Sequence, residues 1–184
     1  MEARFLRAAD LAGLYAEATQ AEAQGAAAVF LIDGGPLGDP FVVAAGLAPV
    51  FPSVLLGVRT SLTPAGRHPA MLAREVTSLD LVCDGRSVLC FGPPFTEALP
   101  EAIALCRAMW RAGEVVSDGP CFPVRASASR PRPVGVGSPR IALDLTAGDE
   151  VPASLATVAD LLLRPLAGPA GSSGPAASCR LERV

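Results

Sequence analysis

The sequence predicts an α/β fold with a mainly parallel sheet, and three observations support that class. Short apolar runs alternate four times with amphipathic segments at helical spacing. The apolar runs are continuous and rich in Val, Leu, Ile and Phe, as expected of strands that are covered on both faces. The connections are short and carry Gly, Pro and Asp, which favours right-handed βαβ units. Such units build either a doubly wound sheet or a barrel, and the alternation alone leaves both open.

The first part of the chain has elements with well-defined ends. Gly25 follows the first amphipathic segment, at the position where a glycine commonly ends a helix. Asp39 before Pro40 is a favourable helix start, because the carboxylate accepts from free backbone amides and Pro needs no donor there. The expected elements are a short strand at residues 3–6, a helix at 10–24, a strand at 26–32, a helix at 40–47 and a strand at 53–60.

The alternation continues through a third and a fourth helix and then weakens. His68 and Pro69 open the third helix, and Thr96 is expected to cap the fourth. Beyond residue 113 the elements are shorter. The expected elements are a helix from Pro69 to the Asp84-Gly85 pair, a strand at 86–91, a helix from Thr96 to Trp110, a hairpin within 114–124, a strand at 141–145, a short helix at 151–158 and a strand at 159–163.

Length and composition indicate one folded domain followed by a tail. The chain has 184 residues, of which 51% are hydrophobic and 18% charged, so it can bury one sizeable core. We expect the domain to occupy residues 1–165. Residues 166–184 are expected to form a disordered tail, because Gly, Pro, Ala and Ser dominate the composition there.

Charge, hydropathy and cysteine usage exclude several classes of protein. The formal net charge of −3 and the scattered arginines offer no basic stripe for nucleic acid. No apolar run reaches the roughly 20 residues that span a bilayer, and the charges near the N-terminus argue against a signal peptide. We therefore expect no membrane partner and a cytoplasmic protein. Five cysteines without paired spacing, and a single histidine, argue against a disulfide framework and against a metal site.

The most specific pattern lies in residues 58–92. It combines a strand ending in Thr60, the triplet Arg67-His68-Pro69 at a helix start, the residues Ala73-Arg74-Glu75 with Leu79-Asp80, and Asp84-Gly85-Arg86 before a strand that ends in Gly92. With these motifs the chain resembles the luciferase-like monooxygenase family, the flavin- and deazaflavin-dependent oxidoreductases built on a (β/α)8 barrel. The flanking segments agree with the resemblance up to about residue 165.

The resemblance implies a TIM (β/α) barrel, here partial or reduced, with about five to six parallel strands. The chain has about half the family's length and stops after the sixth expected strand, so two strands and much of the family's phosphate site are missing. The flavin would lie at the carboxyl ends of the strands. Thr60, Ser61 and Gly92 would approach the isoalloxazine ring. The implied cofactor is FMN or F420, and the implied substrate is a small organic molecule.

Four further residues are candidates for the site. Asp33 follows the strand at 26–32, where several family members place active-site residues. His68 is either a general acid or base, or a residue that organises the helix start. Arg59 and Arg67 flank the expected cofactor loop, and each could be solvated or could hold a phosphate or carboxylate through paired hydrogen bonds. We take Asp33 and His68 as catalytic candidates and Arg67 as a cofactor residue.

Two functions of different classes are compatible with these features. In the first, the protein is a flavin-dependent oxidoreductase, and a partner subunit completes the open barrel. In the second, it is a non-catalytic homologue that acts as a binding or assembly protein. An open barrel exposes two sheet edges, which proteins normally pair or cover, so both functions predict an oligomer. The helices at 40–47 and 69–82 form the family's dimer interface, and we expect a homodimer.

Overall fold

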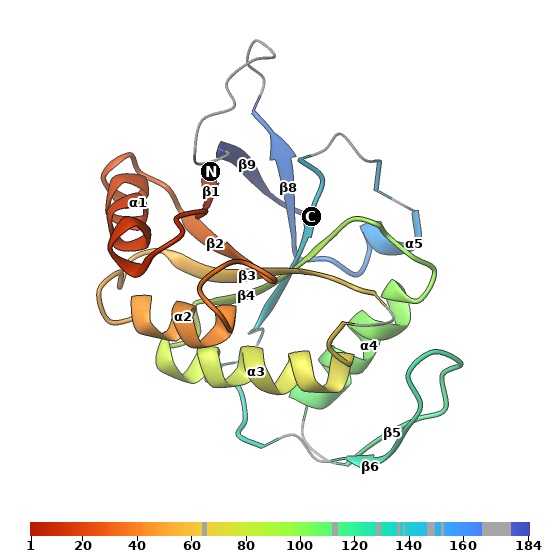
Figure 1. Ribbon diagram of the computed structural model, residues 1–184. Helices are drawn as coiled ribbons and strands as arrows, with labels where there is room; N and C mark the ends of the chain where they lie inside the picture. Colours follow the sequence, from red (N-terminus) through yellow and green to blue (C-terminus); the bar gives the residue numbers. More distant parts are fainter. Residues whose placement is uncertain are drawn as a thin grey trace.

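The protein folds into a closed barrel with helices packed on its outside (Figure 1). The computed structural model describes residues 1–63, 66–111, 114–127, 130–135, 137, 139–146, 150–151, 153–166 and 178–184. The barrel strands, in spatial order, are β1 (Glu2–Phe5), β2 (Ala28–Ile32), β3 (Leu55–Ser61), β4 (Ser87–Gly92), β7 (Arg140–Asp144), β8 (Leu161–Pro165) and β9 (Ser178–Arg183). The helices are α1 (Leu11–Ala23), α2 (Pro40–Leu47), α3 (Pro69–Val82), α4 (Leu99–Trp110) and α5 (Ala153–Ala156), and a separate hairpin pairs β5 (Val115–Ser117) with β6 (Val124–Ser127). Among the described residues, no helix is long and apolar enough to cross a membrane.

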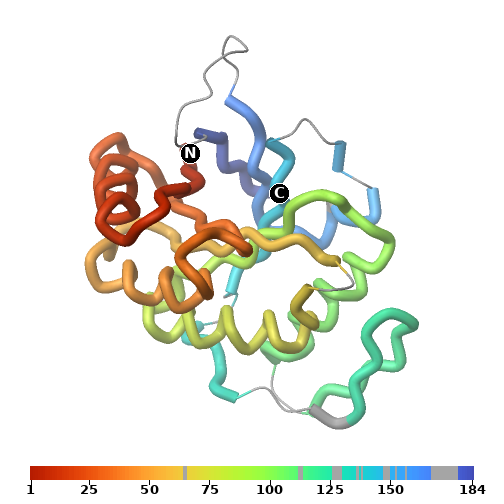
Figure 2. The backbone as a smooth tube through the Cα atoms, in the orientation of Figure 1, coloured from red at the N-terminus to blue at the C-terminus, as the bar shows by residue number. Residues whose placement is uncertain are grey.

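The strand order confirms the predicted fold class. Within the described part of the chain, β1, β2, β3, β4, β7 and β8 pair in parallel, and β9 closes the ring by pairing antiparallel with both β8 and β1. In Figure 2 the first and last strands of the chain accordingly lie side by side. The doubly wound alternative is therefore wrong. The two exposed edges expected of an open barrel do not exist either, and no partner strand is needed to complete it.

The expected disordered tail over residues 166–184 is wrong where β9 forms. In β9 the side chains alternate, with Cys179 and Leu181 buried and Arg180 exposed, and Arg180 lies opposite Glu2 of β1. This alternation of apolar and polar residues is the signature of a half-buried strand. In the sequence, this alternation is hard to recognise because Gly, Pro and Ser residues dominate the segment before it. Residues 167–177, which belong to the same expected tail, lie outside the described residues.

Two phenylalanines fill the narrow interior of the barrel. The rings of Phe5 and Phe30 lie 5.6 Å apart, centroid to centroid, and both side chains are buried. A Cβ atom on Gly57 would lie 2.2 Å from the Phe30 ring, so only glycine fits at that position of β3. The interior of a barrel narrows as strands are removed. Small residues such as Ala28 and Ala142 therefore share the interior with the two rings.

Buried cysteines are part of the packing. Cys90 and Cys179 belong to the interior cluster, and Cys106 lies in the core between barrel and helices. Burial raises the pKa of Cys106 and of Cys179 to about 12, so both remain neutral thiols at physiological pH. All five cysteines are free, as expected from their spacing.

Two of the three expected helix caps form. Asp39 Oδ1 accepts from the backbone N–H groups of Phe41 at 2.9 Å and Val42 at 3.2 Å, and His68 caps α3. The cap expected at Thr96 is wrong. Helix α4 begins at Leu99, with Ala98 in the cap position and no side-chain hydrogen bond. Proline is favoured in the first turn of a helix, where no N–H donor is required. Pro100 is the second residue of α4, so it favours a helix that starts at Leu99.

Candidate active site at the carboxyl ends of the strands

The expected site residues divide into two groups because alternate residues of a strand face opposite sides of the sheet. Ser61 and Gly92 lie at the barrel mouth beside Arg59. Asp33 and Thr60 point the other way, toward α2 and α3, and contact each other there. The structure therefore brings all of these residues to one end of the barrel, in two adjacent clusters.

The first cluster joins three of the expected residues directly. Thr60 Oγ1 donates to Asp33 Oδ2 at 3.0 Å, and Arg67 Nε lies 3.3 Å from the same oxygen. The backbone N–H of Asp33 donates to the carbonyl of Arg59 at 2.8 Å, which fixes the end of β2 against β3. The carboxylate of Asp33 is thus oriented by a hydroxyl and a guanidinium, and it keeps about a quarter of its surface, 23%, exposed.

Arg67 binds two more carboxylates in addition to Asp33. Its terminal nitrogens lie 2.9 Å from Asp39 Oδ2 and 2.8 Å from Glu75 Oε1, and the guanidinium lies 5.6 Å from the centre of the Phe41 ring. Three carboxylates surround one cation, so the cluster has an excess of negative charge. Arg67 is saturated by this network. It therefore joins the end of β2, the start of α2 and the side of α3, and has few donors left for a ligand.

The pKa values of the flanking carboxyls reflect this crowding. Burial raises the pKa of Asp39, but the hydrogen bond from Arg67 and the backbone N–H groups of Val42 and Phe41 outweigh it, and the net pKa is lowered. For Glu75, burial dominates and the pKa is raised despite Arg67. Glu75 Oε2 is buried and has no hydrogen-bond partner among the described residues.

The second cluster is an ion pair across the barrel mouth. Arg59 Nε donates to Asp144 Oδ2 at 3.0 Å, and Asp144 Oδ1 accepts from the backbone N–H and the hydroxyl of Thr146 at 3.0 and 2.6 Å. Asp144 is only 5% exposed. The guanidinium of Arg59 lies over Gly92, where a Cβ atom would come within 2.3 Å of it. A side chain at position 92 would therefore push the guanidinium of Arg59 out of its present place.

His68 lies apart from both clusters. Its Nδ1 accepts from the backbone N–H of Ala70 at 3.2 Å, and its ring meets Phe122 edge-on at 5.5 Å between centroids. The expected role at the helix start is confirmed. The catalytic role expected for His68 stays a prediction.

The space between these residues is large enough for a small molecule. A polar pocket of about 460 Å³ is lined by Asp33, Gly34, Arg59, Thr60, Ser61, Thr63, Gly66 and Arg67. Ligand sites typically have a few hundred Å³ and a few placed polar groups. Hydroxyl and guanidinium donors suit the polar edge of a flavin ring, and the guanidinium of Arg59 covers Gly92 beside them. The residues present fit such a cofactor.

Sequence reasoning underestimated one residue of the mouth and missed two. The sequence leaves Arg59 open between a solvated and an anion-binding residue, and it does not single out Asp144 and Thr146. A signal for Asp144 exists, because it ends an apolar strand in the same way that Asp33 follows β2. Nothing in the sequence indicates that Arg59 and Asp144, 85 residues apart, face each other.

Comparison with solved structures finds the same fold in other proteins. The coenzyme F420 dependent tetrahydromethanopterin reductase from Methanopyrus kandleri is 17% identical and superposes with a TM-score of 0.71 over 88% of this chain and 55% of its own. EDTA monooxygenase from Chelativorans sp. BNC1 is 17% identical, with a TM-score of 0.70 over 86% and 49%. The oxygenating constituent of 3,6-diketocamphane monooxygenase from the CAM plasmid of Pseudomonas putida, solved in complex with FMN, is 17% identical, with a TM-score of 0.54 over 70% and 44%.

These likenesses show the shared fold, and the chain spans about half the length of each of the three proteins. A search of curated protein sequences finds no match. A family model does match, over residues 3–98, which is just over half of the chain and includes β1 to β4. Its description is luciferase-like monooxygenase. The chain belongs to the luciferase-like monooxygenase family.

Proposed function

We propose that this protein binds FMN or F420 in the polar pocket at the ends of β2 and β3 and acts as an oxidoreductase on a small organic molecule. The observation that carries the proposal is the convergence of Asp33, Thr60, Ser61 and Arg59 on one pocket of about 460 Å³, at the carboxyl ends of the strands. In TIM barrels the active site lies at this end. Family membership, and relatives named for F420 or solved with FMN, support the choice of cofactor.

The residues of the pocket have distinct tasks in this proposal. The Nε of Arg59 donates to Asp144. Among the described residues, its terminal nitrogens make only a long 3.5 Å contact to Ser61, so they can donate to the cofactor. Asp33 is oriented by Thr60 and Arg67 and is the candidate to accept a proton from the substrate. The bound cofactor would supply the redox chemistry, and the protein would supply orientation and exclusion of water.

A Gly92→Ala variant tests the site. The added Cβ would displace the Arg59 guanidinium, so we expect the dissociation constant for the cofactor to rise by about tenfold or more, which corresponds to roughly 1.4 kcal/mol. Titration with FMN, FAD and F420, followed by absorbance, fluorescence and thermal shift, measures it. Gly46→Ala is the matched control, because a Cβ there has open space and should leave binding unchanged.

Two outcomes would contradict the proposal. If the unmodified protein binds none of the three cofactors, the oxidoreductase function fails and the non-catalytic alternative takes its place. If the protein binds a cofactor but Gly92→Ala and Gly46→Ala bind it equally well, the cofactor lies elsewhere than the mouth near Gly92.

We also propose a homodimer formed through α2 and α3. The closed barrel leaves no open edge to cover, so this proposal depends on exposed apolar side chains instead. Val42 is 70% exposed and Met71 48%, and each is the third residue of one of these two adjacent helices.

We expect Val42→Glu to lower the dimer fraction about tenfold at a fixed concentration, because burying a charge opposes association. Analytical ultracentrifugation measures it, with Val116→Glu on the separate hairpin as control; a monomeric unmodified protein overturns the proposal.

A further inference from the structure

A second pocket lies over the barrel mouth, next to the proposed cofactor pocket. Its volume is about 210 Å³, and it is lined by Phe5, Arg7, Ile32, Arg59, Pro93, Asp144 and Thr146. Arg59 lines both pockets, so a molecule bound here would lie beside the cofactor. Nothing in the proposed function assigns a role to this second pocket.

The charges of this pocket leave a positive excess. Asp144 is the single acid of the lining, and its two oxygens are occupied by Arg59 Nε and Thr146. Within the described residues, the guanidinium of Arg7 makes no hydrogen bond and no ion pair. Two guanidinium groups against one carboxylate give a net charge of about +1 by simple counting. A single negative charge would balance the site.

The backbone of Arg7 is anchored to the first helix. The N–H groups of Arg7 and Ala8 donate to Glu17 Oε2 of α1, at 2.7 and 3.2 Å. This contact holds the turn after β1 against the first helix. The exposed side chain of Arg7 is therefore carried by an anchored segment, so that only the side chain has to become ordered when it binds an anion.

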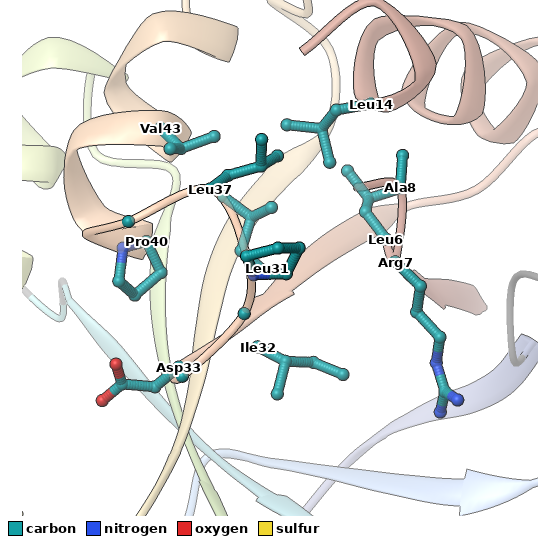
Figure 3. A pocket seen from close by; sticks show the side chains of 14 residues that line it. Leu6, Arg7, Ala8, Leu14, Leu31, Ile32, Asp33, Leu37, Pro40 and Val43 are labelled. Atoms are coloured by element: carbon teal, nitrogen blue, oxygen red, sulfur yellow. The ribbon is translucent and has the colours of Figure 1, made fainter. Parts of the chain in front are cut away.

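An apolar pocket adjoins the charged one. It has a volume of about 200 Å³ and shares Arg7 and Ile32 with the charged pocket; its one acid, Asp33, is paired with Arg67. Figure 3 shows Leu14, Leu31 and Leu37 gathered between α1 and α2, with Arg7 extending away from them on the same side as Ile32. At roughly 30 Å³ per small group, the apolar pocket has room for about six or seven non-hydrogen atoms.

We infer that the barrel mouth binds a small aliphatic monocarboxylate, with its carboxylate between Arg7 and Arg59 and its hydrocarbon part in the apolar pocket. Arg is suited to this task because its planar donors match the two carboxylate oxygens. Under the proposed function, this carboxylate would be the substrate, and that part of the inference rests on the proposed function. The binding site itself stands on the geometry and can be tested without a cofactor.

Isothermal titration of the unmodified protein with 4-methylpentanoate, in the absence of flavin, tests the site. The probe carries one charge and a branched chain that fits the apolar pocket. We expect 4-methylpentanamide, which has the same shape without the charge, and acetate, which lacks the chain, each to bind at least about tenfold more weakly. We expect the same loss of affinity for 4-methylpentanoate with Arg7→Gln. Arg183→Gln is the control, an exposed arginine at the end of β9 that removes the same charge outside the pocket.

The results separate this inference from the proposed function. Equal binding of the acid and the amide, unchanged binding by Arg7→Gln, or no binding of the acid overturns the inference. Cofactor binding is measured independently in the flavin titrations. A protein that binds FMN or F420 but not the acid keeps the proposed function and loses the carboxylate site, whereas one that binds only the acid keeps the site and loses the proposed function.

Discussion

Replacing Leu181 with Asp is expected to destabilise the protein by about 5 kcal/mol, enough to unfold a domain of ordinary stability. Leu181 is 2% exposed and belongs to the interior cluster of the barrel. The substitution removes a buried leucine, which costs about 2–5 kcal/mol, and places an unpaired charge among apolar side chains, which adds several more unless the carboxylate takes up a proton. It also weakens the strand that joins β8 to β1, so closure of the barrel is lost.

Urea unfolding followed by circular dichroism measures this effect. Arg183→Asp is the matched control, because it introduces the same carboxylate at an exposed position of the same strand and should cost less than about 0.5 kcal/mol. If Leu181→Asp unfolds at the same urea concentration as the unmodified protein, residues 178–184 do not line the barrel. The disordered tail expected from composition would then be correct after all.

Replacing Arg67 with Met is expected to cost about 3 kcal/mol at pH 7. The methionine keeps the apolar stem but leaves Asp33, Asp39 and Glu75 facing one another without their shared cation. Removing one partner of a largely buried ion pair costs about 3–5 kcal/mol, and the partial exposure of this cluster places it at the lower end. Arg74→Met, an exposed arginine on the same helix, should be close to neutral.

The loss caused by Arg67→Met should depend on pH with a definite sign. In the unmodified protein the lowered pKa of Asp39 contributes stability that is present above its unfolded value, about 3.9, and lost as pH falls. The raised pKa of Glu75 acts in the opposite sense and favours the folded state at low pH. Without Arg67 all three carboxyls repel one another when ionised. The difference in unfolding free energy between the unmodified protein and Arg67→Met should therefore become smaller as the pH is lowered from 7 to 4. If this difference is the same at every pH, Arg67 stabilises the protein by packing alone.

Much of the first half of the fold could be predicted because its signals are local. A helix cap such as Asp39 acts on the amides two and three residues away, and a buried strand such as β3 is visible as a continuous apolar run. The meeting of Asp33 with Thr60 could also be foreseen, since successive parallel strands place their carboxyl ends at one edge. The identity of the family followed from the same region, which is where the family model matches.

The remainder of the site depends on contacts between distant parts of the chain. Arg67 was expected to hold a cofactor, and only the structure shows that Asp33, Asp39 and Glu75 already occupy its donors. The sequence alone does not distinguish an arginine that faces water from one that faces three carboxylates. Its availability is decided by the atoms packed around it.

The sequence by itself determined the class of fold, the order of the helices and strands as far as β8, and the family, because each depends on periodicity, capping residues and motifs within a few tens of residues. Only the tertiary structure decided that β9 closes the barrel and that Arg59 pairs with Asp144 over Gly92. The physical reason is the same in both cases. Strand closure and a partly buried ion pair are set by which surfaces meet in space. Those surfaces are far apart in the sequence, since β9 pairs with β1 and 85 residues separate Arg59 from Asp144.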